Sequence, residues 1–190
     1  MLFKIKSYLC FLWKSTNQHG VHSPFVYHLV TKCFYNRKER ASEDFITSVV
    51  KNNPCEISLK NAKLLNRLIP YLDYKKILIL SDSSYLITQI LSINNQVSIT
   101  NSPEDQNLFD FIYVDIAQCK NNPELLKTIF SLVHNDSLLL FNKIHKSKSN
   151  QSIWKQIQNN SKTKVTINTY GLGFVFFRKE QEKEHFVIRA

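Results

Sequence analysis

The segment 76–85, with the sequence KILILSDSSY, is the part of the chain whose residues bear most directly on chemistry. Its apolar run Ile77–Leu80 predicts a buried strand, and the polar residues that follow lead into a predicted helix. Many α/β proteins hold a nucleotide-like cofactor at such a junction, because glycines in the turn let the backbone approach a phosphate or ribose closely. Segment 76–85 has no glycine. The sequence therefore predicts a cofactor-binding junction without the glycines that such a site needs.

Length and composition indicate one compact domain in a reducing cytoplasm. The chain has 190 residues, of which 43% are hydrophobic, enough for one core and too few for two ordinary domains. No C-x-x-C spacing joins its four cysteines, so neither a zinc site nor a disulfide framework is expected. The net charge of +10 would suit anionic partners. Because the basic residues are spread without a recognisable nucleic-acid-binding motif, a solvated lysine-rich surface is the preferred interpretation, and a nucleic-acid partner is not expected.

The N-terminal region is predicted to be helical and to pack on the rest of the protein. Met1–Trp13 has apolar residues at helical spacing, with lysines that could flank a membrane surface. No apolar stretch approaches the ~20 residues of a membrane-spanning helix, so a soluble protein is expected. A helix packed on its own domain or on a second subunit is preferred over an interfacial membrane helix. We expect dimerisation to cover this face, with peripheral membrane contact as the alternative.

A histidine-rich motif, HGVHSPFVYH at 19–28, opens the next predicted helix, Pro24–Phe34. Ser23 followed by Pro24 signals the start of a helix, because proline lacks a backbone N–H and the first residue of a helix needs none. No two of the three histidines have the i, i+4 spacing that brings ligands together on one helix face. Capping and packing is therefore the preferred role, and no metal is expected. Lys38–Pro54 is predicted to be helical in part, and 57–72 to form an amphipathic helix.

The remainder of the chain alternates strands with helices. Apolar runs that alternate with helical segments imply a mostly parallel sheet covered on both faces. A hairpin pivoting on Gly171–Gly173 and a short apolar tail at His185–Arg189 close the chain. We therefore expect residues 1–72 to form a helical extension packed on a core of residues 73–190, a Rossmann-like α/β fold. The predicted elements are strands at 77–80, 97–100, 109–114 and 137–141, helices at 85–93, 124–133 and 152–158, and hairpin strands at 164–170 and 173–178.

Several motifs together resemble a known family. They are GVHSPFVY at 20–27, FDFIYVD at 109–115, NDS at 135–137 with Ile144-His145 and Trp154, GFVFFRKEQ at 173–181 and HFVIR at 185–189. This set is similar to the class I S-adenosylmethionine-dependent methyltransferases, often called O-methyltransferases, of Bacteroidetes. The match runs in pieces over most of the chain. It implies the methyltransferase variant of the Rossmann-like fold, with S-adenosylmethionine as the cofactor.

The resemblance also places a cofactor site, and shows what this chain has lost there. The family's acidic position in the first strand corresponds to Ile79, and its two glycine positions to Ser81 and Tyr85, whose ring should fill space that a cofactor needs. The acidic pair after a later strand corresponds to Asn142-Lys143, where an ammonium would repel a divalent cation. Asn101 replaces the carboxylate that would bind the ribose, and accepts hydrogen bonds without charge assistance. The positions that match the family's cofactor site are Ser81, Asp82, Ser83, Tyr85, Asn101 and Asp115.

Asp115 and His145 are the candidate catalytic residues. Asp115 could face the carboxyl ends of the strands and orient a substrate or the cofactor amine, or it could cap the next turn or pair with Lys143. His145 could serve as a general base near pH 7, although a packing or surface role is the preferred interpretation. Trp154 is expected to pack its helix on the sheet.

Three hypotheses follow. The first is a non-catalytic methyltransferase descendant with a binding or assembly role, as a homodimer or with a related methyltransferase. The second is an active but divergent O-methyltransferase acting on an unknown small molecule. The third is a basic module that binds membrane or nucleic acid through the N-terminal segment. We also expect the sheet to lack the strand that normally follows the second, because Pro103–Asn107 is too short for a crossover helix and a strand.

Overall fold

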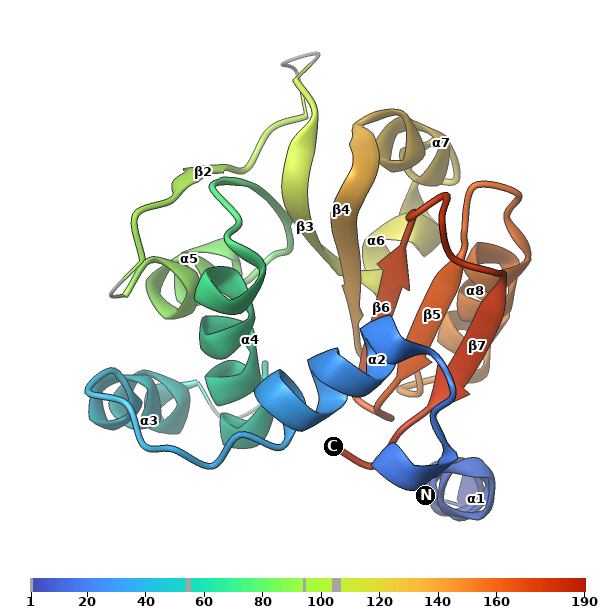
Figure 1. Cartoon of the computed structure of the whole chain (residues 1–190). Helices are drawn as coiled ribbons and strands as arrows, with labels where there is room; N and C mark the ends of the chain where they lie inside the picture. The colour runs from blue at the N-terminus through green and yellow to red at the C-terminus, as the bar shows by residue number, and fades with distance from the viewer. Residues whose placement is uncertain (1, 54–55, 94, 104–106) are drawn as a thin grey trace.

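The protein has a single mixed sheet with helices on both faces (Figure 1). The computed structural model describes residues 2–53, 56–93, 95–103 and 107–190. The helices are α1 (Leu2–Lys14), η1 (Gln18–Gly20), α2 (Pro24–Leu29), η2 (Val30–Phe34), α3 (Glu43–Asn52), α4 (Leu59–Leu72), α5 (Ser84–Ser92), α6 (Ile116–Asn121), α7 (Glu124–Ser131) and α8 (Lys148–Asn159). The strands are β1 (Lys76–Leu80), β2 (Ser98–Thr100), β3 (Phe109–Asp115), β4 (Val133–Asn142), β5 (Val165–Asn168), β6 (Leu172–Phe176) and β7 (Glu184–Val187).

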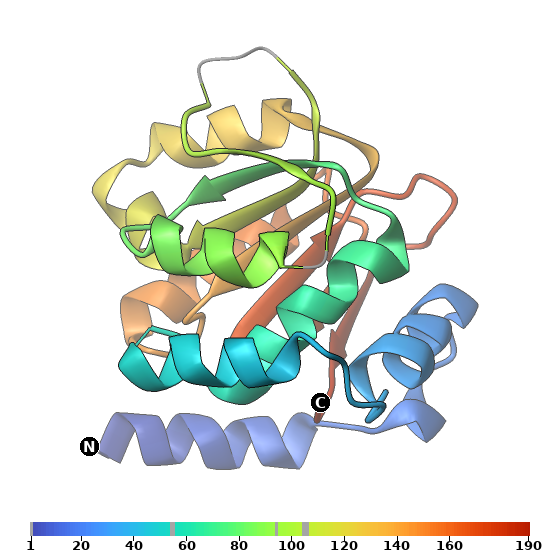
Figure 2. The same ribbon diagram turned by 90° about the vertical axis from the view of Figure 1, so that its left-hand side faces the viewer.

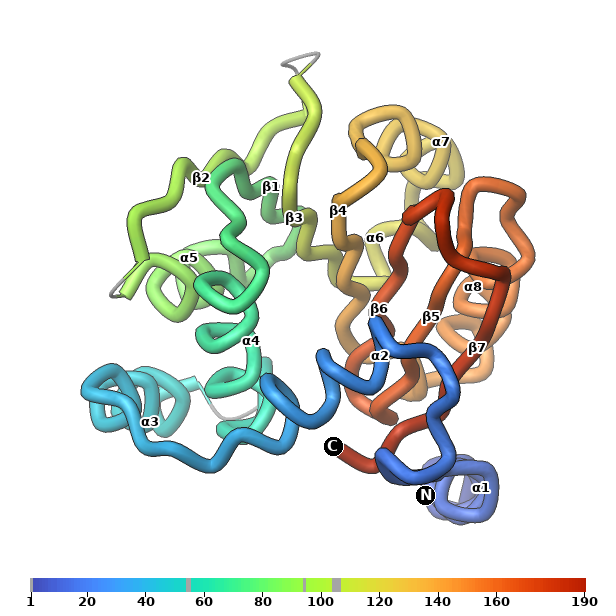
Figure 3. Tube along the Cα trace, viewed as in Figure 1, coloured from blue at the N-terminus to red at the C-terminus, as the bar shows by residue number. Residues whose placement is uncertain are grey.

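The sheet is mostly parallel, as the sequence predicted, and its strands follow the order β2-β1-β3-β4-β6-β5-β7 (Figures 1 and 3). β1 pairs in parallel with β2 and β3, and β3 pairs in parallel with β4. The predicted hairpin is present, because β6 runs antiparallel to both β4 and β5. The carboxyl ends of β1, β3, β4 and β5 therefore point to the same end of the sheet, which we call its carboxyl edge.

The strand expected to be missing is absent from the part of the chain that the structure describes, yet the sheet still has seven strands. β2 forms one edge, and described residues 101–103 and 107–108 form no strand beyond it. Within the segment Pro103–Asn107, residues 104–106 lie outside the described part of the chain. The seventh strand comes from the predicted C-terminal tail: 184–187 forms β7, which pairs in parallel with β5 at the opposite edge. The sequence of this tail did not predict the pairing, because the partner strand β5 lies about twenty residues earlier in the chain.

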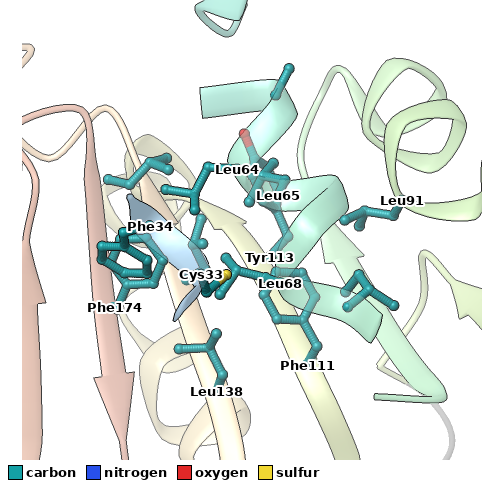
Figure 4. Close-up of a cluster of buried hydrophobic side chains, with 14 of the residues drawn as sticks. Cys33, Phe34, Leu64, Leu65, Leu68, Leu91, Phe111, Tyr113, Leu138 and Phe174 are labelled. Carbon is teal, nitrogen blue, oxygen red and sulfur yellow. The ribbon is translucent and has the colours of Figure 1, made fainter. Parts of the chain in front are cut away.

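Two apolar layers hold the helices on the sheet. Alternating residues of β3 point to opposite faces, as in any strand: Phe111 and Tyr113 join one cluster, and Ile112 and Val114 the other. The first layer contains buried residues of α2, η2, α4 and α5, and Figure 4 shows part of it between α4 and the sheet. The second contains buried residues of α6, α7 and α8. Trp154 packs α8 on the sheet as expected: a Cβ added to Gly173 of β6 would lie 2.6 Å from its ring.

The histidine-rich motif acts as a helix cap. The Ser23 hydroxyl accepts a hydrogen bond from the backbone N–H of Val26 at 3.4 Å, and Pro24 occupies the first helical position. Val26 and Leu29 are buried, so the predicted burial of this second N-terminal helix is confirmed.

The single chain leaves most of the first helix uncovered, and a second subunit that covers it stays a prediction. Of α1, Ser7 and Phe11 are buried, whereas most of its large apolar side chains are exposed in the single chain. Helical spacing predicted the apolar face, but it could not show that this face points away from the sheet. Figure 2 shows α1 running along one end of the molecule.

Asp110 ties the start of β1 to β3. Its Oδ2 accepts hydrogen bonds from the backbone N–H groups of Lys75 and Lys76, each at 2.8 Å, and its Oδ1 lies 3.1 Å from Nε2 of His134. Burial alone would raise the pKa of Asp110, but these hydrogen bonds outweigh it and lower the pKa. The carboxylate form of Asp110 therefore stabilises the fold.

Candidate functional site

The candidate site lies at the carboxyl edge of the sheet, where β1, β3 and β4 end. Open α/β sheets bind ligands at this edge, because the connections that leave the strands diverge there. The end of each strand delivers one of the residues selected from the sequence: Ser81 follows β1, Asp115 ends β3, and Lys143 follows β4.

Asp115 pairs with Lys143, the structural alternative among its two predicted roles. The Lys143 Nζ atom donates to Oδ2 of Asp115 at 3.0 Å. Asp115 precedes the first residue of α6 but makes no side-chain cap hydrogen bond. Its other oxygen, Oδ1, is buried and has no hydrogen-bond partner in the described part of the chain. Of the two carboxylate oxygens of Asp115, Oδ2 therefore has a hydrogen-bond donor and Oδ1 has none among the described residues.

Glu56 is a site residue that the sequence did not reveal. Its Oε2 accepts a second hydrogen bond from Nζ of Lys143, also at 3.0 Å, and its backbone oxygen accepts one from Nδ2 of Asn142 at 3.2 Å. Ser83 also hydrogen-bonds to the Glu56 side chain. One acidic residue from the connection before α4 thereby joins the ends of β1 and β4. No local pattern around Glu56 distinguishes it from any other loop acid.

The electrostatics follow from these three charged groups. Burial raises the pKa of Asp115 above its usual value, although Lys143 opposes the shift. Hydrogen bonds from Ser83 and Lys143 lower the pKa of Glu56. For Lys143, burial alone would lower the pKa, but the two carboxylates outweigh it and raise the pKa. Lys143 is therefore held as a cation between the two carboxylates.

The turn after β1 leads into α5 without a glycine, as the sequence predicted. Ile79, where the resemblance led us to expect an acidic residue in relatives, is 1% exposed and packs in the core, where it offers a ligand no polar atom. No residue of 81–85 has a positive φ, so the turn forms without the conformational freedom of glycine. Tyr85 is 77% exposed. Packing therefore does not fix the direction of its ring, and the expectation that the ring fills a cofactor's space stays a prediction.

The remaining predicted positions are spread around this edge. Asp82 is exposed and accepts a hydrogen bond from Nε2 of Gln118 at 2.7 Å, which links the β1 turn to α6. Asn101 follows β2 and is exposed. A cavity of about 310 Å³ lies beside Lys143, and Lys4 of α1 contributes to its wall.

His145 belongs to a different group of residues. Its Nδ1 lies 3.1 Å from Oγ of Ser7 and 2.8 Å from Nε2 of Gln151, and its Nε2 contacts the Asn168 amide. Its ring stacks on Tyr170 with centroids 5.0 Å apart. Burial lowers the pKa of His145. These contacts join α1 to α8 and β5, which is the packing role preferred from the sequence.

The part of the chain described here contains no group of three or more His, Cys, Asp or Glu side chains placed to hold a metal ion. Cys10, Cys33 and Cys119 are free thiols, and Cys55 lies outside the described residues. None of the described helices is both long and apolar enough to cross a membrane.

Comparison with known proteins bears on the fold. No family model matches the sequence, and no curated protein matches it. Among solved structures, a methyltransferase from Podospora anserina bound to S-adenosylhomocysteine matches with a TM-score of 0.54 at 9% identity, over 84% of this chain and 98% of that one. A candidate caffeoyl-CoA O-methyltransferase from Staphylococcus aureus matches with a TM-score of 0.53 at 15% identity, over 73% of this chain and 93% of that one.

The chain has the Rossmann-like methyltransferase fold. At these identities the likeness extends to the fold and not to the activity. Open α/β sheets in general bind ligands at the carboxyl ends of their strands, and the pairing of Lys143 with Glu56 and Asp115 is found at that end of this sheet.

Proposed function

We propose that this chain is a divergent methyltransferase of the Bacteroidetes group that its motifs resemble, with an eroded S-adenosylmethionine site and a binding or assembly role. The observation that carries the proposal is the ammonium of Lys143 held at 3.0 Å from both Glu56 and Asp115. Asp115 is the carboxylate that survives from the family's site. Because an internal cation already neutralises it, Asp115 is poorly placed to bind the amine of a cofactor.

The other substitutions weaken cofactor binding in the same direction. Ile79 is buried and apolar, so the ammonium of the methionine part would lack a carboxylate partner there. Asn101 offers the ribose a neutral acceptor in place of a charged one. Each unpaired polar group on a bound ligand costs about 1–3 kcal/mol, so two such losses weaken a complex roughly 30-fold or more.

An active O-methyltransferase that acts on an unknown small molecule is the second candidate, and two observations favour it. Oδ1 of Asp115 is buried without a hydrogen-bond partner in the described chain, and it could accept one from a ligand. Tyr85 is 77% exposed, so packing does not hold its ring in one position over the site. A second copy of the chain or a related methyltransferase is the partner we propose for the assembly role.

Thermal melting with S-adenosylmethionine tests the proposal. A ligand present at ~100 times its Kd adds about 2.7 kcal/mol to stability, which for a chain of this size raises the Tm by roughly 5–10 °C. We expect no such rise for the wild-type chain at micromolar cofactor. A rise of that size would overturn the eroded-site proposal in favour of the divergent enzyme.

Two restoring variants would identify the cause of weak binding. Asn101→Asp returns a carboxylate at an exposed position, where the added charge should not disturb folding. Ser81→Gly combined with Tyr85→Gly returns both glycines to the turn. A cofactor-dependent rise in Tm in one of the two variants, but not in the wild type, would assign the loss to the ribose acceptor or to the turn.

A further inference from the structure

Helix α1 presents an apolar ridge to solvent. Leu2 is 85% exposed, Ile5 52%, Leu9 58% and Trp13 86%. Successive members are three or four residues apart, so they line one face of the helix. Contiguous exposed apolar surface of this kind marks a contact with a partner or a membrane.

The opposite face fixes α1 to the protein. Ser7 and Phe11 are buried, and the Ser7 hydroxyl accepts a hydrogen bond from Nε2 of Gln151 at 2.8 Å. The Tyr170 hydroxyl donates to the backbone oxygen of Lys4 at 3.2 Å, and its ring lies 5.4 Å from that of Phe11. The orientation of α1 is therefore set by specific contacts, and the apolar ridge is its outward side.

The charged residues of α1 and of the cavity beside it are basic. α1 contains no Asp or Glu, and its three lysines are exposed. Beside it lies a cavity of about 610 Å³ between α1 and α8, whose described lining has no acidic residue. The exposed lysines of α1 and of this lining are Lys4, Lys6, Lys14, Lys148 and Lys155.

The position of α1 suits contact with a flat surface. In Figure 2 the helix lies along one end of the molecule, with no other element beyond it. Thirteen helical residues extend about 20 Å, which allows an in-plane contact of that length. Tryptophan and lysine are the residues that settle at the headgroup level of a bilayer, with apolar neighbours reaching the acyl boundary.

We propose that α1 is an interfacial helix that seats this protein on an anionic lipid bilayer. The apolar ridge enters the headgroup region, and the surrounding lysines contact lipid phosphates. A second copy packed on the same ridge would bring two sets of lysines together without acidic partners, so the charges favour lipid. The inference depends on α1 alone and holds whether or not the chain binds a cofactor.

Vesicle co-sedimentation of the full chain tests the proposal. We expect partition onto vesicles of phosphatidylcholine with phosphatidylglycerol, much weaker partition onto phosphatidylcholine alone, and a decrease at high salt. Leu9→Ser should weaken partition by ~10-fold or more, because one buried leucine side chain is lost. The matched control is Leu108→Ser, since Leu108 is 47% exposed and precedes β3, at the other end of the sheet.

Tryptophan fluorescence gives a second measurement. Trp154 is 4% exposed, so a blue shift on adding anionic vesicles should come from Trp13 and should be absent in Trp13→Phe. No partition onto anionic vesicles would overturn the proposal. Partition that Leu9→Ser leaves unchanged would assign lipid binding to another surface. A dimer in light scattering that Leu9→Ser dissociates, without vesicle binding, would show that a second copy covers α1.

Discussion

Replacing Lys143 by methionine should destabilise the protein more than any other lysine substitution at the carboxyl edge of the sheet. Methionine keeps most of the apolar stem and tolerates the backbone equally well, since Lys143 has a φ of 62° and neither side chain is β-branched. The backbone contacts, with Gly171 and with the Asn150 side chain, do not depend on the ammonium. The substitution therefore removes the charge and leaves two carboxylates facing each other.

The expected cost is about 2 kcal/mol at pH 7. Removing one partner of a fully buried ion pair costs about 3–5 kcal/mol, and a hydrogen bond to a charged group contributes about 1.5–3 kcal/mol. Here the side chains of Lys143, Asp115 and Glu56 are 17%, 10% and 37% exposed, so solvent screens part of the loss. A loss of about 2 kcal/mol lowers the Tm of a chain of this size by roughly 4–8 °C.

The destabilisation should depend on pH. Without the ammonium, burial raises the pKa of Asp115 further above its value in the unfolded chain. A carboxyl with a raised folded pKa favours folding below the unfolded pKa, and that advantage is lost as the pH rises through the folded pKa. The deficit of the variant should therefore shrink as the pH falls from 7 toward about 4.

Urea denaturation at several pH values measures this, with a double-mutant cycle to isolate the pair. In an Asp115→Asn background, Lys143→Met should cost about 1 kcal/mol less than in the wild type. Lys146→Met is the control, because Lys146 is exposed in the same loop, and it should change stability by less than about 0.5 kcal/mol. Equal effects of the two lysine substitutions, or a deficit that stays constant with pH, would refute the reasoning.

Two further predictions concern the sheet. Gly173→Ala should lower the free energy of unfolding by about 1–3 kcal/mol in urea denaturation, because the added Cβ would lie 2.6 Å from the Trp154 ring. Gly171→Ala should cost clearly less, because its Cβ would meet only the flexible side-chain amide of Asn61. Equal costs would count against this packing argument. Asp110→Asn should reduce the loss of stability that the wild-type chain shows as the pH falls below about 4. A carboxyl whose pKa is lowered in the folded chain stabilises the fold above its unfolded pKa and loses that effect as the pH falls. An unchanged dependence of stability on pH would contradict a stabilising role for the Asp110 carboxylate.

The candidate site could be predicted only in part from sequence. The positions of Asp115 and Lys143 at the ends of neighbouring strands follow from the strand pattern, and their pairing was one of the expected alternatives. The part played by Glu56 could not be predicted, because it lies 87 positions from Lys143 and its local sequence carries no signal. The exposure of Tyr85 could not be predicted either, since residue type alone does not fix the direction of a side chain at the start of a helix.

The sequence by itself determined the α/β class, the elements from β1 to the hairpin apart from α6, and the apolar faces of the N-terminal helices. Those features depend on local periodicity and on turn and capping residues, which act between near neighbours along the chain. Tertiary structure decided that 184–187 pairs with β5, that a loop acid meets the end of β4, and that the ridge of α1 points outward. Each depends on contacts between residues far apart in sequence, and periodicity shows that a face is apolar without showing what covers it.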